Sequence, residues 1–241
     1  MARRSTLFGI LLLGLLLAAG GNALWLWLDK PIQRVSIRGE LQYADSSYLK
    51  NQLTPLVRGQ TWLSVDLEEL RERAMKVGWL HEVRIRREWP NALMFELTEQ
   101  VPVAYWNDDQ LLNSDGTPFD FGPVTPPDDM PVLAGPKGSG QEVLDYYADL
   151  SSRFGSMGVG LEQLRLEARG AWRFQLDDGV WVMLGRNDRV GRLGRLEAAW
   201  QRELGSVASH IRYIDLRYPN GVAVAWHGET EPVAEDGSRQ G

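Results

Sequence analysis

One uninterrupted apolar stretch near the N-terminus, Leu7–Leu28, constrains this chain more than any other feature. No charged residue lies between Arg4 and Asp29. A helix rises about 1.5 Å per residue, so this stretch extends about 33 Å and can cross the ~30 Å hydrocarbon core of a bilayer. A single segment can cross only as a helix, because a helix pairs its own backbone groups. The sequence therefore predicts one transmembrane helix over residues 7–28.

The residues at the two ends of this stretch predict its orientation. Arg3 and Arg4 precede it, and positively charged flanks stay in the cytoplasm. Trp25 and Trp27 lie at the other end, where indole rings favour the membrane interface. We therefore expect a cytoplasmic tail over residues 1–6 and the rest of the chain on the opposite side of the membrane.

A secretory signal peptide is a second interpretation of the same stretch. Leu7–Leu17 has the length of a signal-peptide core, and Ala18–Ala23 is rich in the small residues found at cleavage sites. The apolar character resumes at Leu24–Leu28, beyond any such cleavage site. We therefore expect a retained anchor, and the cleaved signal stays open as the alternative.

Composition limits what the remaining chain of about 210 residues can be, which is enough for one or two domains. The hydrophobic content of 44% supports a packed core, and the net charge of −6 argues against nucleic acid as a partner. The chain has no cysteine. This excludes zinc–thiolate sites and cysteine nucleophiles.

The apolar periodicity of residues 32–100 predicts a small α+β unit with a three-stranded sheet and two helices on one of its faces. The last strand alternates, so Leu93, Phe95 and Leu97 should point inward, and Met94 outward with Glu96 and Thr98. The expected elements are strands at Ile32–Arg38, His81–Glu88 and Ala92–Gln100, and helices at Asp45–Leu53 and from Asp66 to Gly78.

Residues 101–227 predict a second, mixed α/β unit with an antiparallel sheet, and Gly122–Pro131 should be a loop. The polar tail 228–241 should be disordered. Four arginines flank the second helix, where a solvated face is favoured over an anion site: Arg186, Arg189, Arg192 and Arg195. The expected strands are Val103–Trp106, Gln110–Ser114, Glu162–Ala168, Trp172–Leu176, Val180–Leu184, His210–Tyr218 and Val222–Trp226, and the expected helices are Gln141–Phe154 and Asp188–Leu204.

The last predicted strand is the candidate functional element. Val222, Val224 and Trp226 share one face, and Ala223 and Ala225 share the other. Lysine, proline and bulges usually protect an edge strand, and this strand contains neither residue. Such an edge can receive a strand from a partner. An edge covered by the protein's own chain is an equally good interpretation of these residues.

Two motifs resemble a known family. The β-α-α-β-β order resembles a POTRA domain, and the stretch GWLHEVRIRREWPNALMFELTEQVPVAYW is similar to the FtsQ/DivIB cell-division family. Its marks are Arg-x-Trp-Pro-x-x-Leu, ending at Leu93, and Glu-x-x-Pro-x-Ala-x-Trp, ending at Trp106. The resemblance implies a POTRA domain over residues 32–100 and an FtsQ-type β domain over residues 101–227.

The resemblance also implies a function and a binding site. Members of the family are inner-membrane scaffolds at the division septum, with periplasmic domains that bind FtsB paired with FtsL. The POTRA unit is the expected contact for other inner-membrane division proteins. Arg169 matches an arginine that pairs with an acidic residue of the partner. The other implied contact residues are Arg217, Tyr218, Gly221, Val222, Ala223, Val224, Ala225 and Trp226.

The sequence contains no catalytic signature. Nucleophile-elbow, phosphate-loop, zinc-helix and dinucleotide motifs are missing, and the three histidines are expected to lie far apart. We therefore expect no enzymatic activity, cofactor or metal. A POTRA-type periplasmic chaperone or translocation module is the alternative function. At Pro219-Asn220 the chain departs from the family pattern, and proline lacks an amide donor at this turn.

Overall fold

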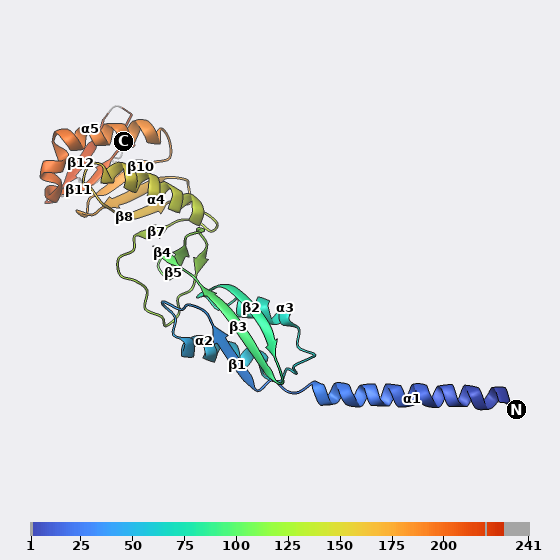
Figure 1. Ribbon diagram of the computed structural model, residues 1–241. Coiled ribbons are helices and arrows are strands. Elements are labelled where there is room, and N and C mark those ends of the chain that lie inside the picture. The colour runs from blue at the N-terminus through green and yellow to red at the C-terminus, as the bar shows by residue number, and fades with distance from the viewer. Residues whose placement is uncertain (1, 220, 229–241) are drawn as a thin grey trace, which may run out of the picture. The chain divides into compact units, whose positions relative to one another are not determined.

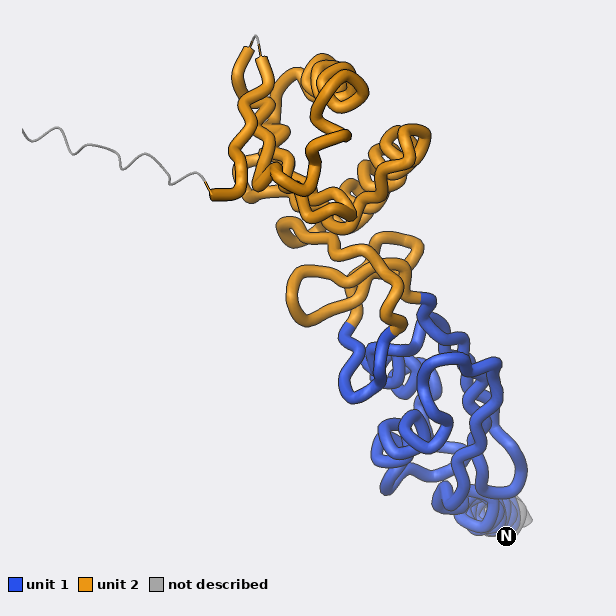
Figure 2. Tube along the Cα trace, turned by 90° about the vertical axis from the view of Figure 1, so that its left-hand side faces the viewer, with its two compact units in different colours: residues 1–101, 120–126 blue, residues 102–119, 127–241 orange. Residues whose placement is uncertain are grey.

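The computed structural model describes residues 2–219 and 221–228, with side chains from residue 9 onwards. Contacts within the chain divide it into two compact units, coloured separately in Figure 2. The first unit runs to Val101 and also includes Asp120–Pro126, and the second contains Pro102–Phe119 and the chain from Pro127 onwards. The sequence analysis assigned Asp120–Pro126 to the second domain, whereas in the structure this segment belongs to the first unit. Of the tail predicted to be disordered, residues 229–241 lie outside the described residues.

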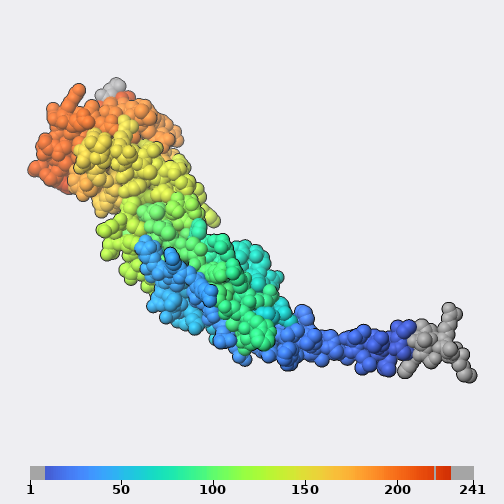
Figure 3. Space-filling view, in the orientation of Figure 1, coloured from blue at the N-terminus to red at the C-terminus, as the bar shows by residue number. Residues whose placement is uncertain are grey.

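The predicted membrane helix is α1, Ala2–Leu28 (Figure 1). Its stretch Gly9–Leu28 has a mean hydropathy of 1.9, and none of it is buried by other parts of the chain (Figure 3). An apolar helix of 20 residues without a packing partner fits a single-pass membrane protein.

The chain directly after α1 is held by a loop of the first unit. The Asp29 carboxylate accepts hydrogen bonds from Thr61 Oγ1 (2.8 Å), from the Leu63 amide (2.7 Å) and from the amide and hydroxyl of Ser64. These bonds, led by the one from the Ser64 hydroxyl, hold the pKa of Asp29 below its usual value. These bonds therefore anchor Asp29, the residue that follows α1, to the loop of residues 61–64.

The first unit has the predicted β-α-α-β-β order. Its central strand β3 (Ala92–Glu99) pairs in parallel with β1 (Arg34–Arg38) and antiparallel with β2 (Leu80–Glu88). The helices are α2 (Ser46–Leu53), the 3₁₀ turn η1 (Thr54–Val57) and α3 (Leu67–Ala74). Asp45 and Asp66 cap α2 and α3 through bonds to backbone amides, as their position before an apolar run predicts.

Two details of the first unit differ from the prediction. Met94 is buried, not outward, because β3 is the central strand and Met94 lies between Ser36 on β1 and Arg86 on β2. The second helix ends at Ala74 rather than at Gly78. A Cβ added to Gly78 would lie 2.0 Å from the backbone oxygen of Asp120. Gly78 therefore permits a close backbone approach and does not cap the helix.

The second unit contains a nine-stranded mixed sheet in the order β12-β11-β10-β9-β8-β7-β4-β5-β6. The short strands β6 and β7 were not predicted. The strands are β4 Pro102–Trp106, β5 Gln110–Asn113, β6 Pro118–Phe119, β7 Val132–Ala134, β8 Leu161–Leu166, β9 Trp172–Leu176, β10 Trp181–Gly185, β11 Ile211–Asp215 and β12 Ala223–Trp226.

Two amphipathic helices, α4 (Gly140–Gly155) and α5 (Arg189–Arg202), pack their apolar residues into the core of the second unit. Arg153 on α4 and Glu197 on α5 form an ion pair, with Nη2 3.0 Å from Oε2. The short 3₁₀ helix η2 (Leu204–His210) leads into β11. Val222, Val224 and Trp226 pack against this core, so the alternation predicted for the last strand is confirmed.

Candidate functional site

Strand β12 lies at one end of the nine-stranded sheet and pairs only with β11 among the described residues. Its pairing with β11 is antiparallel, with Val224 opposite Ile214 and Ala223 opposite Asp215. Ala223 is exposed, while Val224, Ala225 and Trp226 are partly buried. Within residues 2–219 and 221–228, the sheet therefore ends in an edge that no other strand of the chain covers.

The hydrogen bonds identify which backbone groups face this edge. The His227 amide donates to the His210 oxygen at 2.8 Å, toward β11. Because backbone direction alternates along a strand, the amides of Ala225 and Ala223 also point toward β11. The amide and carbonyl of Val224, between these two alanines, then point to the outer side of the sheet. Val224 therefore presents a backbone donor and acceptor outward, while the side chains of Val224 and Trp226 pack on the core.

Arg217 follows β11 and is held by Asp215. The Asp215 carboxylate accepts bonds from the Arg217 amide (2.9 Å), from Nε (2.9 Å) and from Nη2 (2.6 Å). The Asp215 side chain is 9% exposed and that of Arg217 is 64% exposed. Burial alone would raise the pKa of Asp215, but the bonds from Arg217 and the charges of Arg217 and Arg192 together lower it.

Asp215→Asn should reveal this pKa shift as a pH dependence of stability. A carboxyl whose pKa is lowered on folding stabilises the fold above its unfolded pKa of about 3.9, and this contribution is lost as the pH falls through the folded pKa. The wild type should therefore be more stable than the variant at pH 7, with a gap that narrows below about pH 4. Thermal unfolding of both proteins at several pH values measures this gap. A gap independent of pH would contradict the assignment.

The basic flank of α5 holds the chain that leads to the candidate edge. Arg192 donates from Nη1 to the Leu184 oxygen (2.7 Å) and from Nη2 to the Arg217 oxygen (3.2 Å). Arg195 Nη2 lies 3.4 Å from the Tyr218 oxygen. A Cβ at Gly185 would lie 2.5 Å from Arg192 Nη1, so a side chain there would displace this arginine, and the φ of +76° also favours glycine. The prediction of a solvated helix face is therefore wrong for these two arginines.

Arg189 and Arg186 differ from these two arginines in their surroundings. The Arg189 guanidinium carbon lies 4.8 Å from the centroid of the Tyr146 ring and 5.8 Å from that of Trp172, within cation–π range. Arg186 is exposed. The sequence shows the four positive charges. It does not show their different contacts, because the groups that Arg189, Arg192 and Arg195 touch lie on other elements.

The structure brings Arg169 to the same end of the sheet as Arg217, but not into the candidate edge. Arg169 is exposed in the β8–β9 turn, which closes through the bond from the Glu167 amide to the Ala171 oxygen (2.8 Å). The register of β9, β10 and β11 aligns this turn with Gly185 and Asp215. Strands lie about 4.8 Å apart, so β9 and β12 are separated by roughly 14 Å.

The remaining predicted site residues surround the β11–β12 turn. Tyr218 is 59% exposed, and Gly221 and Val222 are partly buried. Pro219 is exposed, and Asn220 lies outside the described residues. The exposed side chains of Arg217 and Tyr218 therefore border the open strand at its start.

The described residues contain no group of three histidine, aspartate or glutamate side chains placed to hold a metal. The expectation that all three histidines lie far apart is wrong for one pair. His227 donates its amide to the His210 oxygen, because these residues pair across β11 and β12. This contact is between backbone groups and supplies no catalytic arrangement.

Comparison with known proteins is consistent with the two-unit fold. Residues 30–100 match a family model described as a POTRA domain, FtsQ-type. Residues 104–217 match a model described as cell division protein FtsQ/DivIB, C-terminal. Together the two matches extend from just after α1 to Arg217, beyond β11.

Several relatives are similar over most of this chain. Cell division protein FtsQ of Neisseria meningitidis serogroup B is 31% identical over 234 residues, which cover 96% of this chain and 98% of the relative. The protein of that name from Thioalkalivibrio sp. is 34% identical, covering 88% and 89%. The one from Escherichia coli K12 is 29% identical, covering 81% and 73%. The chain therefore belongs to the FtsQ/DivIB family of bacterial cell-division proteins.

Proposed function

We propose that this cell-division protein is a non-enzymatic scaffold that captures FtsB, paired with FtsL, by adding a partner strand to β12. The observation that carries the proposal is the position of β12 at the end of the sheet, where the backbone groups of Val224 face outward and no other described strand covers them. An added strand gains affinity from main-chain hydrogen bonds, and side-chain contacts fix its register. Membership in the FtsQ/DivIB family supports the cell-division role over a POTRA-type chaperone.

The side chains at one end of the sheet suit a partner that carries acidic residues. Arg217 and Tyr218 are exposed beside the start of β12, and Arg169 lies at the same end of the sheet. A guanidinium pairs well with a carboxylate through two parallel hydrogen bonds. In this proposal the open edge supplies most of the affinity, while the arginines select the partner and its direction.

We place the protein in the inner membrane at the division septum, with both units in the periplasm. The support is the apolar helix α1 with two arginines before it, together with the family's cell-division role. The POTRA unit is the proposed contact for other inner-membrane division proteins. By binding its partners, the scaffold would control assembly of the division machinery and septal wall synthesis.

Trp226→Ala tests the proposed edge. A buried aromatic anchor typically contributes about 1–3 kcal/mol, so affinity for the periplasmic FtsB–FtsL pair should fall by roughly 5- to 150-fold. Trp181→Ala, on β10 two strands inside the sheet, is the matched control and should change affinity little. Titration calorimetry gives the affinities, and thermal unfolding shows whether each variant keeps its fold. Unchanged affinity in a folded Trp226→Ala protein would count against strand addition.

A backbone variant separates the open edge from the tryptophan side chain. Val224→Pro removes an amide that faces outward, whereas Ala223→Pro removes one that bonds to β11. We expect the first to lose partner binding with its fold retained, and the second to lose stability as well. Full binding by a folded Val224→Pro protein would exclude pairing along this edge.

A further inference from the structure

The turn between β2 and β3 carries the most exposed tryptophan outside the membrane helix. Trp89 is 68% exposed, while every other described tryptophan beyond α1 is buried or partly buried. It belongs to the Arg-x-Trp-Pro-x-x-Leu motif, which the proposed binding edge does not use. Tryptophan buries more apolar area than almost any other side chain, so an indole at a turn tip can contribute strongly to contact with another surface.

Hydrogen bonds tie this turn to the chain that leaves the membrane. The Gln33 amide donates to the Asn91 oxygen and the Asn91 side-chain amide donates to Gln33 Oε1, both at 2.9 Å. Gln33 is only five residues past Leu28, the last residue of α1. Five extended residues span at most about 17 Å. The turn that carries Trp89 is therefore held within that reach of the membrane surface.

Trp62 joins the same two segments a second time. Its amide donates to the Lys30 oxygen at 2.8 Å, and its indole lies 3.0 Å from the Glu88 oxygen and 3.1 Å from the Ala92 oxygen. Lys30 is two residues beyond the apolar span, and Glu88 directly precedes Trp89. Two independent sets of bonds thus fix the turn next to the exit of α1.

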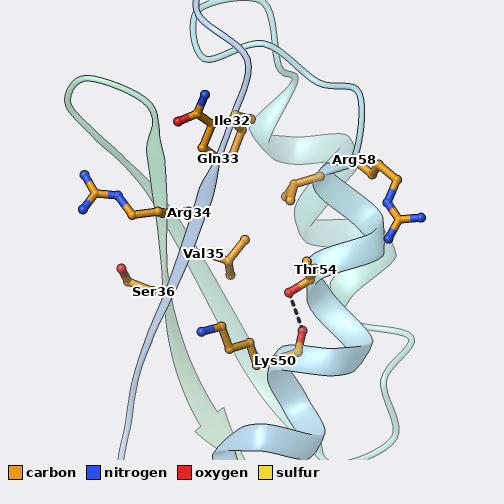
Figure 4. A pocket seen from close by; sticks show the side chains of 9 residues that line it. Ile32, Gln33, Arg34, Val35, Ser36, Lys50, Thr54 and Arg58 are labelled. Atoms are coloured by element: carbon orange, nitrogen blue, oxygen red, sulfur yellow. Dashed lines mark hydrogen bonds between the residues drawn. The ribbon is translucent and has the colours of Figure 1, made fainter.

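Cationic side chains lie on and beside β1, the strand that follows the chain leaving α1. Arg34 lies opposite Ala92 in the register of β1 and β3 and is exposed. A groove of about 500 Å³ beside β1 is lined by Arg34, Lys50 and Arg58 with no carboxylate. Figure 4 shows Arg34 projecting from β1 on the side away from the helix, and Arg58 at the rim of the groove. An exposed arginine opposite the end of a turn that carries an exposed indole matches the chemistry of lipid headgroups.

We propose that Trp89 docks the β2–β3 turn on the interface of the membrane that α1 crosses. The indole would sit among the lipid headgroups, with Arg34 near their phosphates. The first unit would then contact the bilayer at two points, which limits its tilt relative to the membrane. This inference rests on α1 being a retained span, and it is independent of partner capture at β12.

Lipid quenching of a single label tests the docking in the full chain. The protein has no cysteine, so Glu88→Cys and Thr98→Cys each give one labelling site on the same hairpin. Thr98 is exposed and lies six residues along β3 from Ala92, roughly 20 Å from the turn. In phosphatidylethanolamine–phosphatidylglycerol vesicles containing lipids with a nitroxide on the headgroup, the label at position 88 should be quenched several-fold more than that at position 98. Equal quenching at the two positions would overturn the proposal.

Replacement of the tryptophan separates its own contribution from simple nearness to the membrane. Adding Trp89→Ala to the Glu88→Cys protein should reduce the quenching several-fold, and Trp89→Phe should restore part of it. Unchanged quenching without the indole would also overturn the proposal. Thermal unfolding shows whether the Trp89 variants are folded. The comparison of labels at positions 88 and 98 uses proteins that keep Trp89, so it holds even if a Trp89 variant does not fold. Because the vesicles hold only this chain and lipid, a protein partner as the true occupant would appear as the absence of quenching.

Discussion

Replacing Glu99 with alanine should lower the free energy of unfolding of the first unit by about 3–5 kcal/mol. Glu99 ends β3 and is 8% exposed. Its carboxylate accepts hydrogen bonds from three successive backbone amides, those of Gln42 (2.6 Å), Tyr43 (3.0 Å) and Ala44. Without the carboxylate, all three donors lose their partner; Ala44 is buried and Tyr43 is partly buried, and each unsatisfied buried group costs about 1–3 kcal/mol.

Glu96→Ala is the matched control for Glu99→Ala. Glu96 lies on the same strand and pairs with Arg86 at 3.3 Å, where the side chains are 30% and 67% exposed. A pair this exposed contributes about 0–1 kcal/mol, so its loss should be small. Denaturant unfolding, followed by circular dichroism, measures both changes. Similar effects of the two substitutions would show that the amides of residues 42–44 do not depend on Glu99.

Gly78→Ala should destabilise the first unit by about 3 kcal/mol, because the methyl group would overpack a close backbone contact. The added Cβ would lie 2.0 Å from the Asp120 oxygen, so one of the two backbones must move. The next residue, Trp79, donates from its indole to the Phe121 oxygen at 2.8 Å. Both contacts hold Asp120–Pro126 on the first unit, and the methyl group should displace that segment.

Gly194→Ala provides the contrast for Gly78→Ala. Gly194 lies inside α5, and a Cβ added there would meet nothing within 4 Å. The same substitution should therefore stabilise the protein by up to about 1 kcal/mol through helix propensity. Thermal unfolding measures both variants, and limited proteolysis reports whether 120–126 is released in Gly78→Ala. A stable, protease-resistant Gly78→Ala protein would contradict the close approach.

Local patterns in the sequence were sufficient for the elements whose chemistry is itself local. Apolar length alone determined the membrane helix, and alternating residues determined strands such as β2 and β9. Aspartates before apolar runs determined where α2 and α3 begin, because the capping bonds join residues two or three positions apart. The apolar face of the last strand was also predictable, because alternation places every second side chain on the same face.

Contacts between distant segments decided the rest. Glu99 gives no local signal, because its amide partners lie more than fifty residues earlier in the chain. Arg192 was predicted to be a solvated charge, because the carbonyl groups that it contacts, on β10 and just after β11, lie outside its own helix. An alternating strand has the same sequence pattern at the edge of a sheet as inside it, because the alternation depends only on which face each side chain occupies. The sequence by itself therefore determined the two faces of β12. Only the tertiary structure decided that no other strand of residues 2–219 and 221–228 covers its outer side, because strand order depends on pairings between residues far apart in the chain.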